Sequence, residues 1–317
     1  MLDILGITGP IYAAIGLGYA TTRWGLFNAA DMRAFGKFVL NLALPAMLFN
    51  ALAQRHITEI LNGSYLLAYL AGSLVVVGAG LFWCRRVEGL AGTASAVRVM
   101  GMACSNSGFV GFPILLLTVA PVAGVVLALN MVVENFIIIP LMLALAERGR
   151  GDGGHWVRVV GQSLGRLLRN PLIIGLLAGF VVSVSGWQLP GPVSRTVSLF
   201  ATASGALSLF VIGGALVGLP MRGMLRQVAP VVVGKLLVFP LAVLLGVAAL
   251  PVFGLPPLDP ALRQAAVLMA AMPMMGIYPI LAMQYGLQGI AASALLVATV
   301  ASFFTINLAM WMFRNLA

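Results

Sequence analysis

A short polar cluster interrupts a long apolar stretch of the sequence. Ser105, Asn106, Ser107 and Gly108 lie within residues 99–133, which carry no charged side chain. Their hydroxyl and amide groups can donate and accept hydrogen bonds, so they can bind a polar or anionic group. Packing between membrane helices, which favours small residues, is the alternative. It does not require the asparagine.

Glycine and proline residues break the helix at this cluster and at a second place. Gly111 and Pro113 follow the cluster, and Pro273, Gly276 and Pro279 interrupt a later apolar segment. Proline removes a backbone hydrogen bond and displaces a carbonyl group, and lipid cannot satisfy the freed groups. The breaks therefore predict a site enclosed by protein, although a simple kink would also explain the second. The candidate substrate-binding residues are Ser105, Asn106, Ser107, Gly108, Gly111, Pro113, Pro273, Met274, Gly276 and Pro279.

Glu134 and Lys235 are the charged residues that lie deepest in apolar segments. Ionisable residues inside a membrane are costly and are candidates for function. Asn130 lies one helical turn before Glu134, on the same face. These three residues are candidates for ion coupling, in which Glu134 binds H⁺ or Na⁺; a structural salt bridge between the two charges is the other interpretation. Asn41 and Pro45 kink the second predicted helix, where they line the site from a scaffold or serve packing alone.

The elements that must position these residues are membrane-spanning helices. The 317-residue chain is 61% hydrophobic and 8% charged, with a mean hydropathy of +1.07, whereas a soluble protein carries about 25% charged residues. A spanning helix needs about 20 apolar residues. We predict an all-α integral membrane protein with ten such helices, at 4–21, 31–53, 62–84, 91–117, 121–146, 168–186, 192–218, 227–250, 261–284 and 288–313.

The basic residues predict the orientation of the chain. The net charge is +10, but Lys and Arg form short clusters between apolar segments, which is typical of topology signals facing anionic lipid. With the N-terminus outside, thirteen basic residues face the cytoplasm and four face outside. We predict a multi-pass protein of the bacterial inner (plasma) membrane with both termini outside. No metal-ligand spacing joins His56 and His155, so no cofactor is expected beyond a coupling H⁺ or Na⁺.

An internal repeat divides the chain near its middle. A shift of 166 residues brings the first five predicted helices onto the last five and Pro113 onto Pro279. We predict repeats at 1–146 and 170–317, joined by a cytoplasmic linker at 147–169. Each repeat has an odd number of spans, so the second is inverted. Inverted repeats with interrupted helices are typical of secondary transporters, which bind substrate near the midplane.

Several motifs resemble the auxin efflux carrier (AEC) family, which includes bacterial carriers of malonate, malate and other organic acids and the plant auxin exporters. Asn106, Gly111 and Pro113 match a spacing found in the fourth helix of plant members, and residues 271–279 resemble the interrupted run of their ninth helix. The sequences LPAMLF, LSLFVIGGAL and RNPLIIGLLAG are also similar to family members. The resemblance covers nearly the whole chain.

This resemblance implies a fold with two crossing broken helices, the fourth and the ninth, as in sodium/proton antiporters and bile-acid symporters. The first, second, sixth and seventh helices would form a scaffold, and the others a moving transport domain. Asn106 would meet a substrate carboxylate, and movement would be elevator-like. The chain departs from plant members at Ser105, where they carry proline, and it lacks the acidic residue that some of them hold in the third helix.

The sequence therefore predicts a secondary active transporter of small organic anions, such as malonate, malate or auxin-like acids. The alternative is a sodium- or proton-coupled symporter or antiporter of the bile-acid symporter type, but such proteins place several carboxylates near the crossing, where Glu134 stands alone. An enzyme is not expected, because no two of the eight acidic residues form a metal-binding pair. The expected partners are a small organic anion, membrane lipid and a second copy bound through the scaffold helices, with no nucleic acid.

Overall fold

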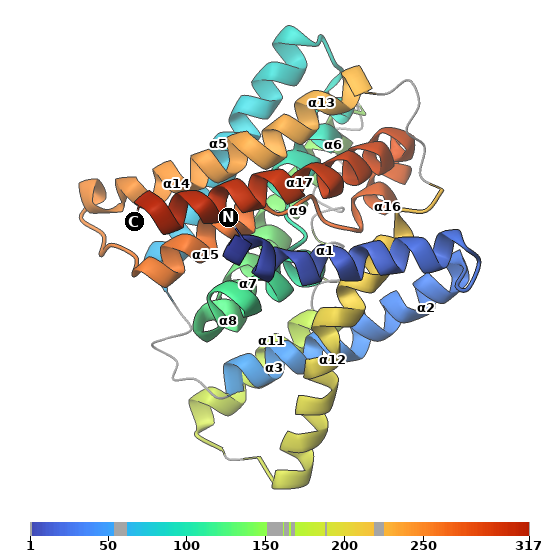
Figure 1. Ribbon diagram of the computed structural model, residues 1–317. Coiled ribbons are helices and arrows are strands. Elements are labelled where there is room, and N and C mark those ends of the chain that lie inside the picture. Colours follow the sequence, from blue (N-terminus) through green and yellow to red (C-terminus); the bar gives the residue numbers. More distant parts are fainter. Residues whose placement is uncertain are drawn as a thin grey trace. The chain divides into compact units, whose positions relative to one another are not determined.

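The computed structural model describes residues 2–316, apart from 54–61, 151–160, 162–164, 166–168, 188 and 219–224. His56, His155 and most of the predicted linker lie outside the described residues. The α-helices are α1 Leu2–Arg23, α2 Ala29–Phe38, α3 Leu44–Ala53, α5 Gly63–Phe82, α6 Gly92–Ala103, α7 Phe112–Thr118, α8 Ala120–Val132, α9 Ile139–Arg148, α11 Pro171–Ser185, α12 Gly191–Ala215, α13 Leu225–Val233, α14 Phe239–Ala249, α15 Pro260–Ala271, α16 Tyr278–Met283 and α17 Gln288–Leu316 (Figure 1).

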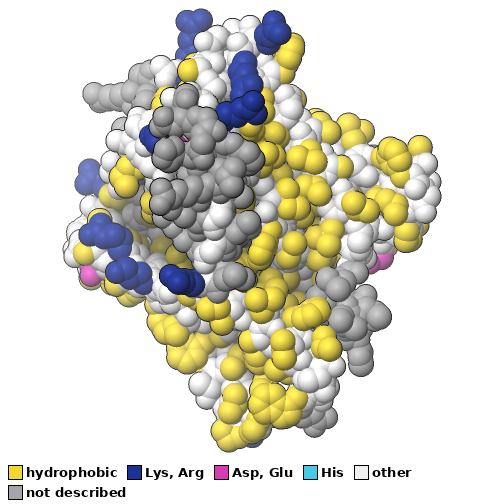
Figure 2. All heavy atoms as spheres, turned by 180° about the vertical axis from the view of Figure 1, so that it is seen from behind, with side chains coloured by type: hydrophobic (Ala, Val, Ile, Leu, Met, Phe, Trp, Pro, Cys, Tyr) yellow, Lys and Arg dark blue, Asp and Glu magenta, His cyan; other side chains and the backbone are white. Residues whose placement is uncertain are grey.

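The described part of the chain contains no β-strand, so the prediction of an all-α fold is confirmed there. Six helical runs are long and apolar enough to cross a membrane: Ala29–Ala53, Gly63–Val87, Ala120–Arg148, Gly191–Ala215, Leu225–Phe253 and Gln288–Asn315. Hydrophobic side chains cover broad areas of the face seen in Figure 2, as contact with lipid requires. The chain is a multi-pass membrane protein. Ten crossings and the inverted repeat stay predictions.

Local signals account for several helix starts. Asn28 and Asp31 form a reciprocal capping box at the start of α2, in which each side chain accepts a backbone N–H of the other residue. Asn170 caps α11, whose first residue is Pro171, where a missing N–H is not needed. Helix α5 begins at Gly63. These starts lie within three residues of the predicted starts at 31, 168 and 62.

Five π-helical turns interrupt the described helices: η1 Val39–Ala43, η2 Trp83–Val87, η3 Ser107–Gly111, η4 Val133–Ile138 and η5 Gly234–Val238. In all but η2, the next helix has proline at its second residue. A proline cannot donate to the carbonyl four residues back, and its ring pushes that carbonyl away, so the backbone widens into the π pattern. The four turns that precede a proline carry Asn41, Ser107, Glu134 and Lys235.

The chain folds as two compact units, and each takes segments from both halves of the sequence. Unit 1 comprises Met1–Asn62, Gly108–Leu129 and Leu167–Gly218, and unit 2 comprises Gly63–Ser107, Asn130–Arg166 and Leu219–Ala317. These units reflect which helices pack together, whereas the predicted repeats at 1–146 and 170–317 reflect internal symmetry. The repeat boundaries therefore stay a prediction.

Close backbone contacts hold unit 1 together. Helix α12 packs on α1, α2 and α3, and α3 packs on α11. A Cβ atom at Gly213 of α12 would overlap the Ile15 carbonyl of α1, and one at Gly18 of α1 would overlap the Phe210 carbonyl of α12. Small residues of this kind let membrane helices approach closely.

Unit 2 surrounds the polar residues singled out above. Helix α14 packs on α5 and α15, α6 packs on α5 and α9, and α17 packs on α13, α15 and α16. In Figure 1, α13 and α14 run in line beside α17. Buried polar side chains of α5, η4, η5 and the segment that follows α6 contact one another inside this unit.

Candidate functional site

The two predicted helix breaks meet inside unit 2. The first lies between α6 and η3, and the second lies between α15 and α16. Ser105 and Met274 form an isolated antiparallel bridge, and the Asn106 N–H donates to the Pro273 carbonyl at 2.8 Å. All four residues are buried. Each break therefore satisfies part of the backbone of the other, which lipid could not do.

Glu134 lies in η4, is 4% exposed and binds the first break. Its Oε1 accepts hydrogen bonds from the Ser105 N–H (3.0 Å), the Ser107 hydroxyl (3.2 Å) and the Tyr69 hydroxyl (3.1 Å), and its Oε2 accepts from Ser107 at 3.1 Å. In a continuous helix the Ser105 N–H would donate to Gly101. The carboxylate therefore replaces a backbone acceptor that the break removes.

Lys235 lies in η5, is fully buried and binds the second break. Its Nζ donates to the Ala270 carbonyl at 2.7 Å and to Ser105 Oγ at 2.8 Å, and lies 4.4 Å from the centroid of the Phe239 ring. In a continuous helix the Ala270 carbonyl would accept from Met274. The ammonium replaces that donor, and the negative end of the α15 dipole also favours it.

Ser105 connects the two charges. Its N–H donates to Glu134 and its hydroxyl oxygen accepts from Lys235. A proline at this position would have neither the N–H nor the hydroxyl. The departure from the plant pattern therefore creates a link between carboxylate and ammonium that a proline could not form.

Asn106 and Asn130 each retain an amide nitrogen without a partner. Both Nδ2 atoms are buried and make no hydrogen bond. Asn130 accepts from the Tyr65 hydroxyl at 2.8 Å through its Oδ1. An unsatisfied buried donor costs about 1–3 kcal/mol, so each Nδ2 is suited to an acceptor that the chain does not supply, such as a carboxylate oxygen.

Tyr65 and Tyr69 of α5 complete this polar cluster, and the sequence analysis did not identify them. Their rings are stacked with centroids 6.0 Å apart, and the Tyr69 ring lies 5.5 Å from that of Phe239. Both tyrosines are fully buried. Two tyrosines one turn apart in a charge-free helix were the available signal, because a buried tyrosine hydroxyl needs a polar partner.

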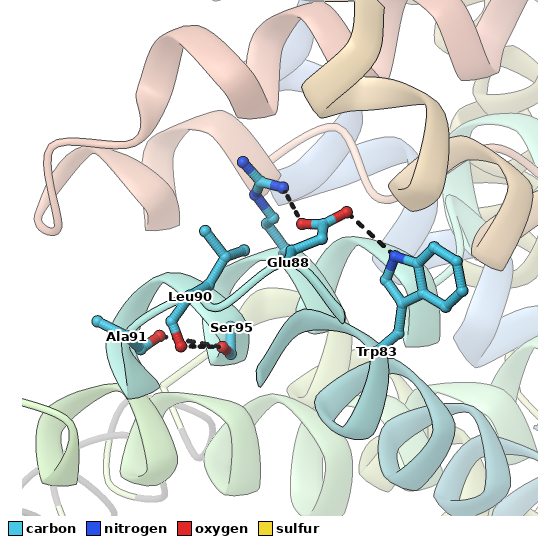
Figure 3. A network of polar contacts seen from close by, with 6 residues as sticks. Trp83, Glu88, Leu90, Ala91 and Ser95 are labelled. Atoms are coloured by element: carbon cyan, nitrogen blue, oxygen red, sulfur yellow. Dashed lines mark hydrogen bonds and ion pairs between the residues drawn. The ribbon is translucent and has the colours of Figure 1, made fainter. Parts of the chain in front are cut away.

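Arg98 of α6 is another buried cation that the sequence analysis treated only as a topology signal. It is 7% exposed, and its Nη1 donates to Glu88 Oε2 at 2.5 Å. Glu88 Oε1 accepts from Trp83 Nε1 at 3.1 Å (Figure 3). The Arg98 Nε is buried without a partner. Arg98 lies in the middle of α6, seven residues before Ser105, which follows the end of that helix.

Gly276 and Pro279 lie beyond the bridge between the breaks. Gly276 is half-buried in the turn before α16, and Pro279 is the second residue of α16, where its missing N–H is not needed. Tyr278 between them packs on α6, since a Cβ atom at Gly101 would lie 2.7 Å from its ring. The second break therefore contacts α6 through Tyr278.

The remaining candidates belong to unit 1. Gly108 and Gly111 are buried in η3, and Pro113 is buried at the start of α7. Asn41 is exposed and donates to the carbonyl one turn back at 2.7 Å, and Pro45 follows at the start of α3. Among the described residues, no cluster of His, Cys, Asp or Glu could hold a metal ion.

Comparison with known proteins places these features in a family. The family model described as "Membrane transport protein" matches residues 7–312. A Rhizobium meliloti (strain 1021) protein named "Putative malonate transporter" is 26% identical over 328 residues, which cover 99% of this chain and 97% of that protein. "Uncharacterized transporter YfdV" of Escherichia coli (strain K12) is 28% identical over 244 residues, which cover 74% of this chain and 76% of that protein.

Proposed function

Because the chain belongs to the membrane transport protein family, the AEC family identified from its motifs, we propose that it is a secondary active transporter of small organic anions that works by an elevator-type mechanism. The observation that carries this proposal is the buried, unpaired Nδ2 of Asn106 beside the contact between the two breaks. An amide donor at that place suits a carboxylate, whose oxygens only accept hydrogen bonds.

The charges around Asn106 favour an anion with two carboxylates. Lys235 binds the neighbouring Ser105, and the buried Arg98 of α6 precedes Ser105 by seven residues in the chain. A relative named as a malonate transporter supports the same class. In this proposal the first carboxylate binds Asn106, and Arg98 exchanges part of its contact with Glu88 for the second.

The grouping of the helices supports a moving unit. Unit 2 holds α5, α6, α9 and α13–α17, which fall in the helices that the resemblance assigns to the transport domain. Unit 1 holds α1–α3, α11 and α12, which fall in the scaffold helices, together with α7 and most of α8. In an elevator mechanism unit 2 would carry the substrate as a body, and alternate exposure of the site would follow.

Uptake by the purified protein in proteoliposomes tests the proposal. The substrates are labelled malonate, a labelled monocarboxylate of similar size and malonamide, the neutral diamide that keeps the shape but not the charges. We expect saturable uptake of malonate above that of empty liposomes and none of malonamide. Equal uptake of malonate and malonamide, or no uptake of either acid, would refute anion transport.

Coupling to H⁺ or Na⁺ is the second candidate function, and the buried Glu134 carboxylate favours it. The residue is enclosed by hydroxyl and amide donors and linked to Lys235 through Ser105. Uptake under an imposed pH or Na⁺ gradient measures the coupling. If Glu134 binds the coupling ion, Glu134→Gln removes the gradient dependence and leaves exchange of substrate intact. Gradient-independent uptake by the unaltered protein would identify a uniporter.

A further inference from the structure

An apolar groove runs along one side of unit 2. It lies between η5 and α14 on one wall and α15 and α17 on the others, with a volume of about 310 Å³. We call it the Arg263 groove; its lining includes Leu236, Leu244, Arg263, Ala271, Thr305 and Ala309. Leu241 and Leu308 of its walls are more than half exposed, so the groove opens where a membrane protein meets lipid.

The groove extends along most of α15. Arg263, Val267 and Ala271 line it, and their spacing of four residues places them on one helix face. Arg263 lies near the start of α15 and Ala271 is its last residue. The groove therefore runs from a charged end to the level of the second break.

Arg263 makes the charged end chemically specific. It is the one charged residue among the described residues that line the groove, and its Nε is buried without a hydrogen-bond partner. A guanidinium presents donors in a planar fork that matches a phosphate group. The rest of the lining is apolar except for the hydroxyl of Thr305.

We propose that the Arg263 groove binds one acyl chain of an anionic phospholipid whose phosphate contacts Arg263. The combination of one phosphate-binding side chain with a long apolar slot fits an amphiphile with a charged head and a hydrocarbon tail. A small carboxylate would leave the apolar length unfilled.

A lipid in this groove would contact residues next to the hydrogen bond between the Lys235 ammonium and the Ala270 carbonyl. Leu236 follows Lys235, and Ala271 follows Ala270, whose carbonyl accepts from the Lys235 ammonium. The end of an acyl chain would pack against both neighbours and hold this bond in place. Binding itself does not depend on the transported substrate, so it can be tested without a transport assay.

Native mass spectrometry of the purified, lipid-depleted full-length protein measures binding directly. The probes are phosphatidylglycerol and phosphatidylcholine with identical acyl chains. We expect phosphatidylglycerol to bind about fivefold more tightly than phosphatidylcholine. This is the gain in affinity for an anionic lipid that one basic residue near a membrane surface provides. Arg263→Gln should abolish this preference, whereas Arg195→Gln, which changes an exposed arginine of α12 outside the groove, should retain it.

A second variant tests the apolar part of the groove. Ala309→Trp fills the slot from α17 and should weaken binding of both lipids without changing their ratio. The proposal fails if the unaltered protein binds the two lipids equally, if Arg263→Gln keeps the preference, or if Ala309→Trp binds both as well as before. It also fails if sn-glycerol 3-phosphate displaces the lipid at equal concentration, because the site would then recognise phosphate without the chain.

Discussion

Glu134 and Lys235 take the places of backbone groups that a continuous helix would have supplied. Glu134 accepts the Ser105 N–H at the first break, and Lys235 donates to the Ala270 carbonyl at the second. Each charge also compensates the other in surroundings that exclude water. Removing one member of such a buried pair leaves an uncompensated charge, which costs about 3–5 kcal/mol.

Lys235→Met should therefore lower stability far more than an ordinary lysine substitution. We expect a loss of about 3–5 kcal/mol, part of which Glu134→Gln recovers in the double variant, because the uncompensated carboxylate is then gone. Thermal unfolding of the detergent-purified single and double variants measures this coupling. Lys37→Met, at an exposed lysine, is the matched control. Additive losses in the double variant would contradict a coupled pair.

The sequence identified the two charges and the Ser105–Ser107 segment that binds them, but not Tyr65, Tyr69 or the buried Arg98. Glu134 and Lys235 stand out because a charge in an apolar segment is rare, and Asn106 stands out beside its glycine and proline. Arg98 borders an apolar segment, where it reads as a topology signal. It pairs with Glu88, which also accepts a hydrogen bond from Trp83, and no local pattern encodes this pairing.

Prolines set the geometry of the elements that carry these side chains. Pro140 and Pro240 follow the π turns of Glu134 and Lys235, and the wider turn alters the direction of the side chains within it. The helix starts at Asn28 and Asn170 follow from capping, which is local, and were predictable. The bridge between Ser105 and Met274 joins residues far apart in sequence, so the local pattern indicates two breaks, and only the family resemblance led us to expect that they cross.

Close packing of α1 against α12 yields a prediction about unit 1. Gly213→Leu would force a side chain into the Ile15 carbonyl, and overpacking costs about 1–3 kcal/mol even where only side chains must move. We expect a lower unfolding temperature and aggregation on size-exclusion chromatography. Gly205→Leu on the same helix is the control, since a Cβ atom there meets nothing within 4 Å. Equal behaviour of the two variants would rule out this contact.

The whole molecule has an orientation that the basic residues predict and that can be tested on intact cells. Trp24 (81% exposed) and Trp187 (61% exposed) lie in connections expected on opposite sides of the membrane, and both native cysteines are buried. Trp187→Cys should react with a membrane-impermeant maleimide added outside, and Trp24→Cys should react only after permeabilisation. Labelling of Trp24→Cys alone by the maleimide added outside would contradict the predicted orientation and indicate the opposite one.

The proposal that unit 2 transports an anion, bound where its two helix breaks meet, is tested most directly by substituting Asn106. Malonate uptake should be compared in proteoliposomes that contain unaltered protein, Asn106→Ala or Asn315→Ala, whose exposed amide donates within its own helix. A buried hydrogen bond to a charged group contributes about 1.5–3 kcal/mol. We therefore predict that Asn106→Ala raises KM about 10- to 100-fold, while Asn315→Ala behaves as the unaltered protein does. Uptake by Asn106→Ala equal to that of Asn315→Ala would contradict a substrate site at the breaks.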